Sequence, residues 1–170
     1  METNIEFLYL YTEVTIAFVA FATIVATLRQ AFGGRLTPFQ YLIFRMFVEV
    51  GLLLVFMAMI PVAIFHLFSD ELVVWRISTY LMIGSILLEL PFHIRRRLRL
   101  RLPISNMSTT SRCVLIGWGI CLLLMILTAT ETLWIPSIYT TTGFLIWGMI
   151  ATAILFAEFL GDYIEVEEEA

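Results

Sequence analysis

Six ionisable residues lie within or at the edges of otherwise apolar stretches of this 170-residue chain. They are Glu13, Arg45, Glu49, Arg76, Glu89 and Glu158. An ionisable side chain in the interior of a bilayer costs roughly 2.5–3.5 kcal/mol on insertion scales, so it normally faces protein or water and finds a partner. Intramembrane carboxylates of this kind often mark proton or cation paths. Movement of a proton or cation is therefore the first chemistry to consider.

The spacing of these residues predicts which of them meet. Arg45 and Glu49 are four positions apart, so they stack on one face of a helix. Glu89 is expected at a similar depth on a neighbouring helix, which would place two acids around one guanidinium. Glu13 and Arg76 are expected near the opposite side of the membrane, at depths that allow them to pair.

Glu13 shares a helical face with mostly small residues. These are Ala17, Ala20, Ile24 and Thr27. Small residues let two helices approach closely, so we expect Glu13 to face another helix rather than lipid. Glu158, at the inner end of the last apolar stretch, is a fourth acid that is also near enough to the headgroups to reach them.

Two interpretations of these charges remain open. In the first, Glu13 forms the outer mouth of a proton or cation path, and Glu49 and Glu89 lie toward the inner mouth. That path needs water, because only serine and threonine hydroxyls are expected between the two levels. In the second, the charges are paired contacts that fix helix register and oligomeric state. The second interpretation is the one we expect.

The composition determines which kind of element must hold these residues. Hydrophobic residues make up 61% of the chain, against about 45–50% in soluble domains, which excludes an ordinary soluble protein. The mean hydropathy of +0.95 agrees. Five apolar stretches are long enough to cross a hydrocarbon core about 30 Å thick. They cover residues 7–28, 41–68, 72–94, 113–130 and 138–160.

The sequence therefore predicts an all-α polytopic membrane protein, a five-transmembrane-helix bundle in residues 1–162 followed by an acidic tail in residues 163–170. The connections are short and polar. Thr37 is expected as the N-cap of the second helix, with Pro38 at its first position. Residues 69–71 have a helix-start signature, and residues 134–137 form an expected interfacial turn with Trp134 as an aromatic anchor.

All ten basic residues are arginines, and their distribution predicts the orientation. Nine of them flank or lie in the first and third connections, and only Arg76 lies near the second. Because cytoplasmic loops are enriched in basic residues, we expect the N-terminus outside and the C-terminus in the cytoplasm.

The third connection carries a run in which basic and apolar residues alternate. Its arginines are Arg95, Arg96, Arg97, Arg99 and Arg101. A period of two suggests an extended segment in the interface, with leucines toward the acyl chains. We expect these guanidinium groups to contact anionic lipid on the cytoplasmic side. The acidic tail falls on the same side.

The sequence patterns typical of metal binding, redox chemistry and enzymatic catalysis are not found. His66 and His93 end different stretches on opposite sides, and Cys113 and Cys121 have neither redox nor zinc-site spacing, so we expect no metal site and no cofactor. No phosphate-binding or nucleophile motif is present, so we expect no enzymatic activity.

The first third of the chain resembles a loosely defined group of small bacterial multi-pass membrane proteins of unknown function. The resemblance rests on residues 12–18, on the Ala- and Phe-rich stretch that ends at Arg29, and on residues 36–38 followed by Arg45 and Glu49. The chain departs from the group at Ala20 and Ala22, where glycine is frequent. The resemblance implies a bacterial cytoplasmic membrane and supplies no activity.

Taken together, the sequence predicts a non-enzymatic membrane component that oligomerises or binds a partner. Its expected partners are membrane lipids, a second copy or another membrane protein, and no nucleic acid. The alternative is a small proton or cation channel or transporter that uses the intramembrane carboxylates.

Overall fold

The computed structural model describes the backbone of residues 2–31, 37–99 and 108–168, and their side chains in residues 5–28, 31, 37, 40–99 and 108–161. The chain forms five helices: α1 (Glu2–Ala31), α2 (Pro38–Phe65), α3 (Glu71–Arg99), α4 (Thr109–Ala129) and α5 (Ile138–Glu168). Each contains a stretch long and apolar enough to cross a membrane. The prediction of an all-helical chain with five such stretches is confirmed.

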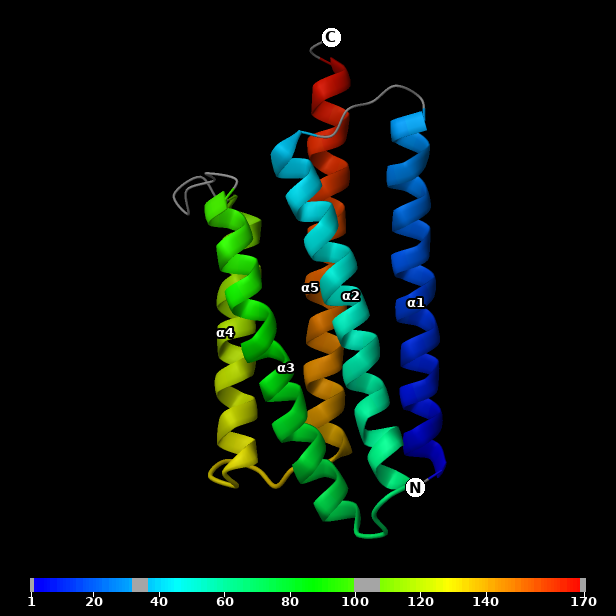
Figure 1. The fold of residues 1–170 in the computed structure, drawn as a ribbon, viewed down its shortest axis with the longest axis vertical. Helices are drawn as coiled ribbons and strands as arrows, with labels where there is room; N and C mark the ends of the chain where they lie inside the picture. The colour runs from blue at the N-terminus through cyan, green and yellow to red at the C-terminus, as the bar shows by residue number, and fades with distance from the viewer. Residues whose placement is uncertain (1, 32–36, 100–107, 169–170) are drawn as a thin grey trace.

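The helices run up and down side by side, and α2 is the central one (Figure 1). It packs against α1, α3 and α5, while α4 closes the other side against α3 and α5. α1 is an edge helix that contacts α2 and touches α5 only slightly. We call the end of the bundle that holds the α4–α5 connection the Trp134 end, and the end where α3 finishes the arginine end.

Local signals set the helix starts as the sequence predicts. Thr37 caps α2: its hydroxyl accepts from the Gln40 backbone N–H at 3.2 Å, and its own N–H donates to the Gln40 side chain at 3.1 Å. This reciprocal capping box satisfies two N–H groups that would otherwise lack partners. At the start of α3, an Asp70 carboxylate oxygen accepts from the Leu72 N–H at 2.9 Å.

The predicted boundaries need correction at the arginine end. α3 continues through Arg99, so Arg95, Arg96, Arg97 and Arg99 lie on a helix and not on an extended segment. The alternating pattern was misleading because consecutive residues on a helix point about 100° apart, which spreads the guanidinium groups around α3. Arg101 lies outside the described residues.

Two further boundaries also differ. α4 begins at Thr109, four residues before the predicted start, so Arg112 belongs to a helix. The backbone of α5 stays helical through Glu168, which brings most of the predicted tail into the last helix.

The core follows α2 on both sides. Trp75, Leu54, Met57 and Leu145 are fully buried where α2, α3 and α5 meet. Helix approach is close at Gly148, where an added Cβ would overlap the Leu54 side chain. Toward the arginine end, a second cluster of phenylalanines joins α1, α2 and α5. Neighbouring rings pack edge-on, tilted or stacked, with centroids 5.3–6.4 Å apart, and belong to Phe18, Phe44, Phe47, Phe156 and Phe159.

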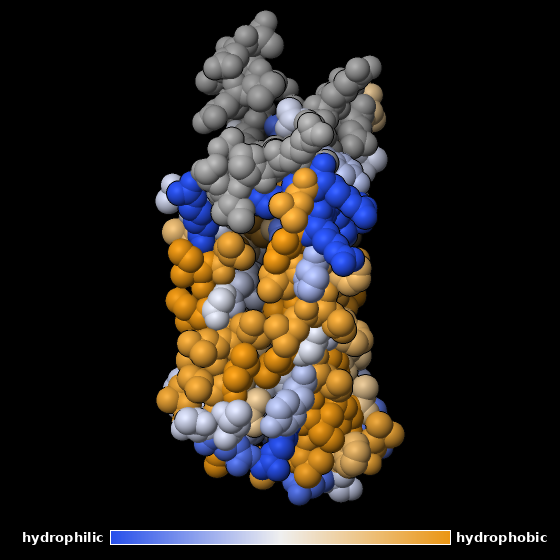
Figure 2. All heavy atoms as spheres, turned by 60° about the vertical axis from the view of Figure 1, so that its left-hand side comes forward, coloured by the Kyte–Doolittle hydropathy of each residue, from blue (hydrophilic) through white to orange (hydrophobic). Residues whose placement is uncertain are grey.

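The outer surface is apolar across its middle. Figure 2 shows hydrophobic residues covering the middle of one face, with hydrophilic residues gathered toward both ends. Many large apolar side chains point outward from every helix, including Leu52, Leu88, Ile116 and Leu123. A largely apolar surface of this kind is what contact with acyl chains requires.

Candidate functional site

The predicted cluster around Arg45 and Glu49 forms, but with a different third member. Arg45 Nε lies 2.8 Å from Glu49 Oε1, one helical turn away on α2. The second carboxylate oxygen of Glu49 accepts from Arg96, which reaches over from α3. Glu49 therefore has two guanidinium partners, and its side chain is only about a quarter exposed, at 27%. The cluster carries one net positive charge rather than the predicted surplus negative charge.

Glu89 does not join this cluster, which corrects the predicted grouping of two acids around Arg45. Arg96, two helical turns beyond Glu89, is the α3 residue that reaches Glu49. The arginines were expected in a connection, but α3 extends through them and runs past Glu49. Among the described residues, Glu89 makes no hydrogen bond and no ion pair, and it is partly buried.

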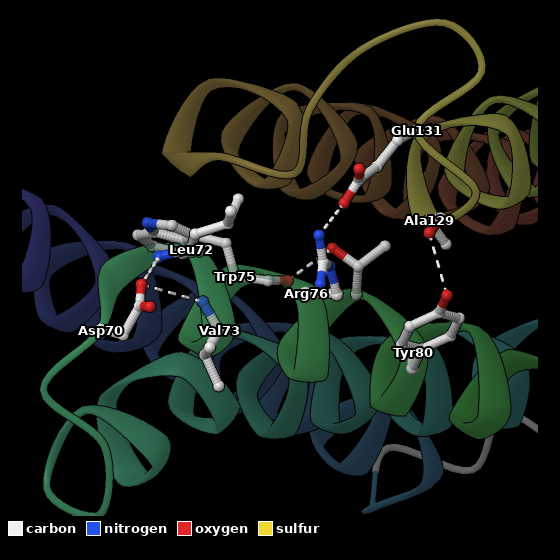
Figure 3. Close-up of polar contacts among 9 residues, drawn as sticks. Asp70, Leu72, Val73, Trp75, Arg76, Tyr80, Ala129 and Glu131 are labelled. Carbon is white, nitrogen blue, oxygen red and sulfur yellow. Dashed lines mark hydrogen bonds and ion pairs between the residues drawn. The ribbon is translucent and has the colours of Figure 1, made fainter.

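Arg76 pairs with Glu131 instead of the predicted Glu13. Glu131 lies just after α4, and one of its carboxylate oxygens accepts from Arg76 Nη2 (Figure 3). One turn along α3, the Tyr80 hydroxyl donates to the Ala129 carbonyl at 2.9 Å. The two contacts tie the end of α4 to the side of α3.

Glu131 holds the one positive φ found at a non-glycine residue in the described chain, at 57°. Its N–H donates to the Thr128 carbonyl and the Thr132 N–H to the Leu127 carbonyl, both at 2.9 Å. This is the Schellman arrangement that usually places glycine at this position. The sequence has no glycine at this position, so neither the left-handed turn nor the contact made by Glu131 was predicted.

Glu158 ties α5 to the start of α4. One carboxylate oxygen accepts from the Ser108 hydroxyl, and the other accepts from the Ser111 hydroxyl at 2.9 Å. Ser108 is also the N-cap of α4, with its hydroxyl accepting from the Ser111 N–H at 3.0 Å. Both serines stand near the beginning of α4 in the sequence, but nothing in their spacing indicates a carboxylate partner on α5.

Glu13 points outward from the bundle, so it meets neither Arg76, its predicted partner, nor another helix within this chain. α1 buries the opposite stripe against its neighbours, formed by Leu8, Thr12, Thr15, Val19, Ala22 and Ala26. Glu13, Ala17, Ala20, Ile24 and Thr27 are all exposed. Among the described residues, Glu13 makes no hydrogen bond and no ion pair.

The hydroxyl groups in the middle of the bundle are largely committed to their own helices. Thr15, Ser78 and Thr152 are fully buried, and each donates to the carbonyl four residues earlier at 2.6–2.8 Å. The Tyr11 hydroxyl donates across helices to the Leu145 carbonyl at 2.8 Å. These bonds use the donors that could otherwise line a water-filled path.

A cavity of about 790 Å³ lies between α3, α4 and α5 at the Trp134 end. It was not foreseen, because no residue type in its lining is unusual for a membrane helix. Among the described residues, no group of three or more His, Cys, Asp or Glu side chains could hold a metal ion. Cys113 and Cys121 are free thiols.

No family model, no curated protein and no solved structure matches the chain.

Proposed function

We propose that this chain is a non-enzymatic integral membrane protein that assembles with a second copy of itself through the outward face of α1. The N-terminus lies outside and the C-terminus in the cytoplasm, in a bacterial cytoplasmic membrane. The five apolar helices support the membrane location. The orientation rests on the arginines gathered at one end, and the bacterial membrane on the resemblance of the first third of the chain.

The observation that carries the proposal is the position of Glu13. It stands eight residues into the apolar stretch Ile5–Leu28, or about 12 Å along a stretch about 36 Å long at 1.5 Å per residue. Its side chain is exposed there and has no partner among the described residues. A carboxylate left among acyl chains is costly, and contact with another chain removes that cost.

Glu13 heads a row of exposed residues that we call the Glu13 seam: Glu13, Ala17, Ala20, Ile24 and Thr27. The positions advance by four, three, four and three residues, which is the 3.5-residue repeat of helices that wind around each other with a left-handed twist. Ala17 and Ala20 let two backbones approach closely. The seam therefore has both the repeat and the side-chain size of a helix-pairing surface.

A second copy fits this seam because of its symmetry. Two copies inserted the same way around a twofold axis along the membrane normal place their α1 helices parallel and at the same depth. Each seam residue then meets its own counterpart, small against small. The two Glu13 carboxyl groups then lie together between the helices, away from the acyl chains.

Disulfide trapping in membranes tests the assembly. Ala20→Cys is introduced into the full chain with Cys113 and Cys121 replaced by serine, and Ala153→Cys on the exposed face of α5 is the matched control. Mild oxidation is expected to give a band at twice 19.5 kDa for Ala20→Cys and not for Ala153→Cys. Equal cross-linking of the two variants, no cross-link, or a cross-link only to a different protein would overturn pairing through the seam.

The arginine end supplies the contact with anionic lipid in this proposal. Arg95 and Arg99 are exposed at the end of α3, while Arg96 is committed to Glu49. Arg97 is partly buried, and Arg101 lies beyond the described residues. Each basic side chain near an anionic surface contributes about 1 kcal/mol of attraction, so this end is favoured on the cytoplasmic leaflet.

The alternative, a proton or cation path, has weaker support. Glu49 is engaged by two arginines, Glu158 by two serines and Glu13 faces outward, so these carboxylates do not converge on one passage in a single copy. Only Glu89 combines partial burial with the absence of a described partner. The flux experiment in the Discussion addresses this alternative.

A further inference from the structure

The cavity at the Trp134 end has an uncharged lining. α3 contributes Thr79, α4 contributes Cys121, Leu124, Met125 and Thr128, and the α4–α5 connection and the start of α5 supply the rest, including Trp134 and Thr141. No Asp, Glu, Lys, Arg or His is among the described residues that line it. A site without a counter-charge favours a neutral ligand, because burying an unpaired charge is costly.

Three of the six hydroxyl groups among the described lining residues already donate to a carbonyl. Thr79 donates to the Trp75 carbonyl and Thr128 to the Leu124 carbonyl, both at 2.8 Å. The Thr140 hydroxyl donates to the Ser137 carbonyl at 2.9 Å. These oxygens keep only acceptor capacity.

Thr141 is different, since its hydroxyl oxygen is buried without a partner among the described residues, in a residue that is only 4% exposed. A helical threonine usually donates to the carbonyl four residues back, which here is that of Ser137. That carbonyl already accepts from the Thr141 N–H at 3.1 Å and from the Thr140 hydroxyl. Both of its lone pairs are occupied, so the Thr141 hydroxyl is left without an acceptor.

We propose that this cavity binds a neutral amphipathic lipid, a molecule with an apolar chain or ring and one uncharged hydroxyl or carbonyl group. The apolar walls contact the chain, and the Thr141 hydroxyl hydrogen-bonds the polar group. Rotation about χ1 exchanges the hydroxyl and methyl positions of Thr141, and threonine in helices occupies both rotamers. The volume of about 790 Å³ falls within the range of sites that enclose small organic ligands.

The ligand comes from the membrane phase. The walls belong to three helices that are each long and apolar enough to cross a membrane, and the cavity lies toward one end of them. A lipid dissolved in that leaflet reaches the cavity without crossing water. The inference shares only the membrane location with the proposed function and does not depend on pairing through α1.

Photolabelling of the full chain in liposomes tests this inference. The probe is a hexadecanol that carries a diazirine in its chain, and the charged comparison is the matching hexadecyl phosphate. The expected result is labelling of cavity residues on α4 and α5 by the alcohol, displaced by unlabelled hexadecanol. Labelling spread evenly over outward faces, or equal cavity labelling by the phosphate, would overturn the proposal.

Two matched pairs of variants locate the binding. Gly143 lines the cavity and Gly119 does not, and an added Cβ meets nothing within 4 Å at either helical position. Gly143→Leu is expected to reduce cavity labelling severalfold, and Gly119→Leu to leave it unchanged. Thr141→Val is expected to weaken displacement by hexadecanol about fivefold, the loss of one ordinary hydrogen bond, and Thr142→Val is its control.

Folding and assembly are monitored separately. Circular dichroism and size-exclusion chromatography check that each variant is helical and monodisperse, and Gly143→Ala is a milder replacement if Gly143→Leu does not fold. Unchanged labelling in folded Gly143→Leu would contradict the cavity as the binding site. Because Ala20 lies on α1, away from the cavity, and the photolabelled variants keep Cys113 and Cys121, failure of one proposal is distinguishable from failure of the other.

Discussion

Arg96 on α3 donates to the carboxylate of Glu49 on α2, and Arg45 holds the other oxygen of the same carboxylate. One acid therefore joins two helices near the arginine end of the bundle. Arg76 with Glu131 joins α3 to the end of α4, and Glu158 joins α5 to the start of α4. Of the six ionisable residues predicted within or beside the apolar stretches, Arg45, Glu49, Arg76 and Glu158 form contacts with other side chains, whereas Glu13 and Glu89 have no partner among the described residues.

Replacing Glu49 is expected to destabilise the bundle more than replacing Glu89. Glu49→Gln removes the negative charge and one of the two acceptor oxygens that hold the exposed Arg45 and the partly buried Arg96, and is expected to lower the free energy of unfolding by about 1–3 kcal/mol. Glu89→Gln removes no described contact and is expected to change it by less than about 0.5 kcal/mol. Thermal unfolding in the same detergent compares the two. Equal losses would contradict the assigned role of Glu49.

Two opposing effects on stability meet at Glu131: the strain of its backbone and the ion pair of its side chain. Its φ of 57° lies in the left-handed region, which costs a residue with a Cβ about 1 kcal/mol relative to glycine. Arg76 and Glu131 side chains are 42% and 41% exposed, so their ion pair is expected to contribute at most about 1 kcal/mol.

Glu131→Gly and Glu131→Gln both remove that ion pair, but only the glycine variant also removes the strain. We expect Glu131→Gly to unfold at a higher temperature than Glu131→Gln. A glycine variant that is the less stable of the two would show that the left-handed turn is not strained in the protein.

The Thr141 hydroxyl is expected to lower the stability of the protein when no ligand occupies the cavity. Thr141→Val removes a buried group that lacks a partner and should leave stability unchanged or raise it by up to about 1–3 kcal/mol in detergent without added lipid. Thr152 is the matched control, since it is fully buried and its hydroxyl donates to the Gly148 carbonyl at 2.6 Å. Thr152→Val is expected to be destabilising. If Thr141→Val also lost stability, as Thr152→Val is expected to, the Thr141 hydroxyl would have a partner in the protein.

Ion flux in liposomes addresses the alternative function. Purified protein under an imposed proton or potassium gradient is expected to give no flux above that of empty vesicles, because the described carboxylates do not converge on one passage. Glu49→Gln and Glu89→Gln are measured in parallel with protein shown to be inserted. Flux in the original protein that falls in both variants would overturn a purely structural role for these acids.

Much of the fold was predictable from local features of the sequence. Five apolar stretches, the Thr37–Pro38 helix start and the helix-start signature at Asp70 all appear where they were expected. These features depend on residues within a few positions of one another or on average hydropathy, both of which are read directly along the chain.

The partners of the charged residues were much less predictable. The pair of Arg45 with Glu49 was found because it lies within one helix. The pairs of Glu49 with Arg96 and of Arg76 with Glu131 depend on where α3 ends and on which neighbour it lies beside. The sequence analysis placed Arg96 in a connection, so it was not predicted as a second partner of Glu49, and Glu89, two helical turns earlier on α3, was expected in the cluster instead.

By itself, the amino-acid sequence determined the element type, the number of membrane-length helices and the short-range contacts, because hydropathy and i to i+4 spacing act locally. Only the tertiary structure decided that Glu13 faces outward, that Glu89 is left without a described partner and that a cavity forms beside Thr141. Those outcomes depend on the rotation and neighbours of whole helices. The faces of these helices have similar hydropathy, so hydropathy does not indicate which face is buried. The fit between small and large side chains on neighbouring helices determines it.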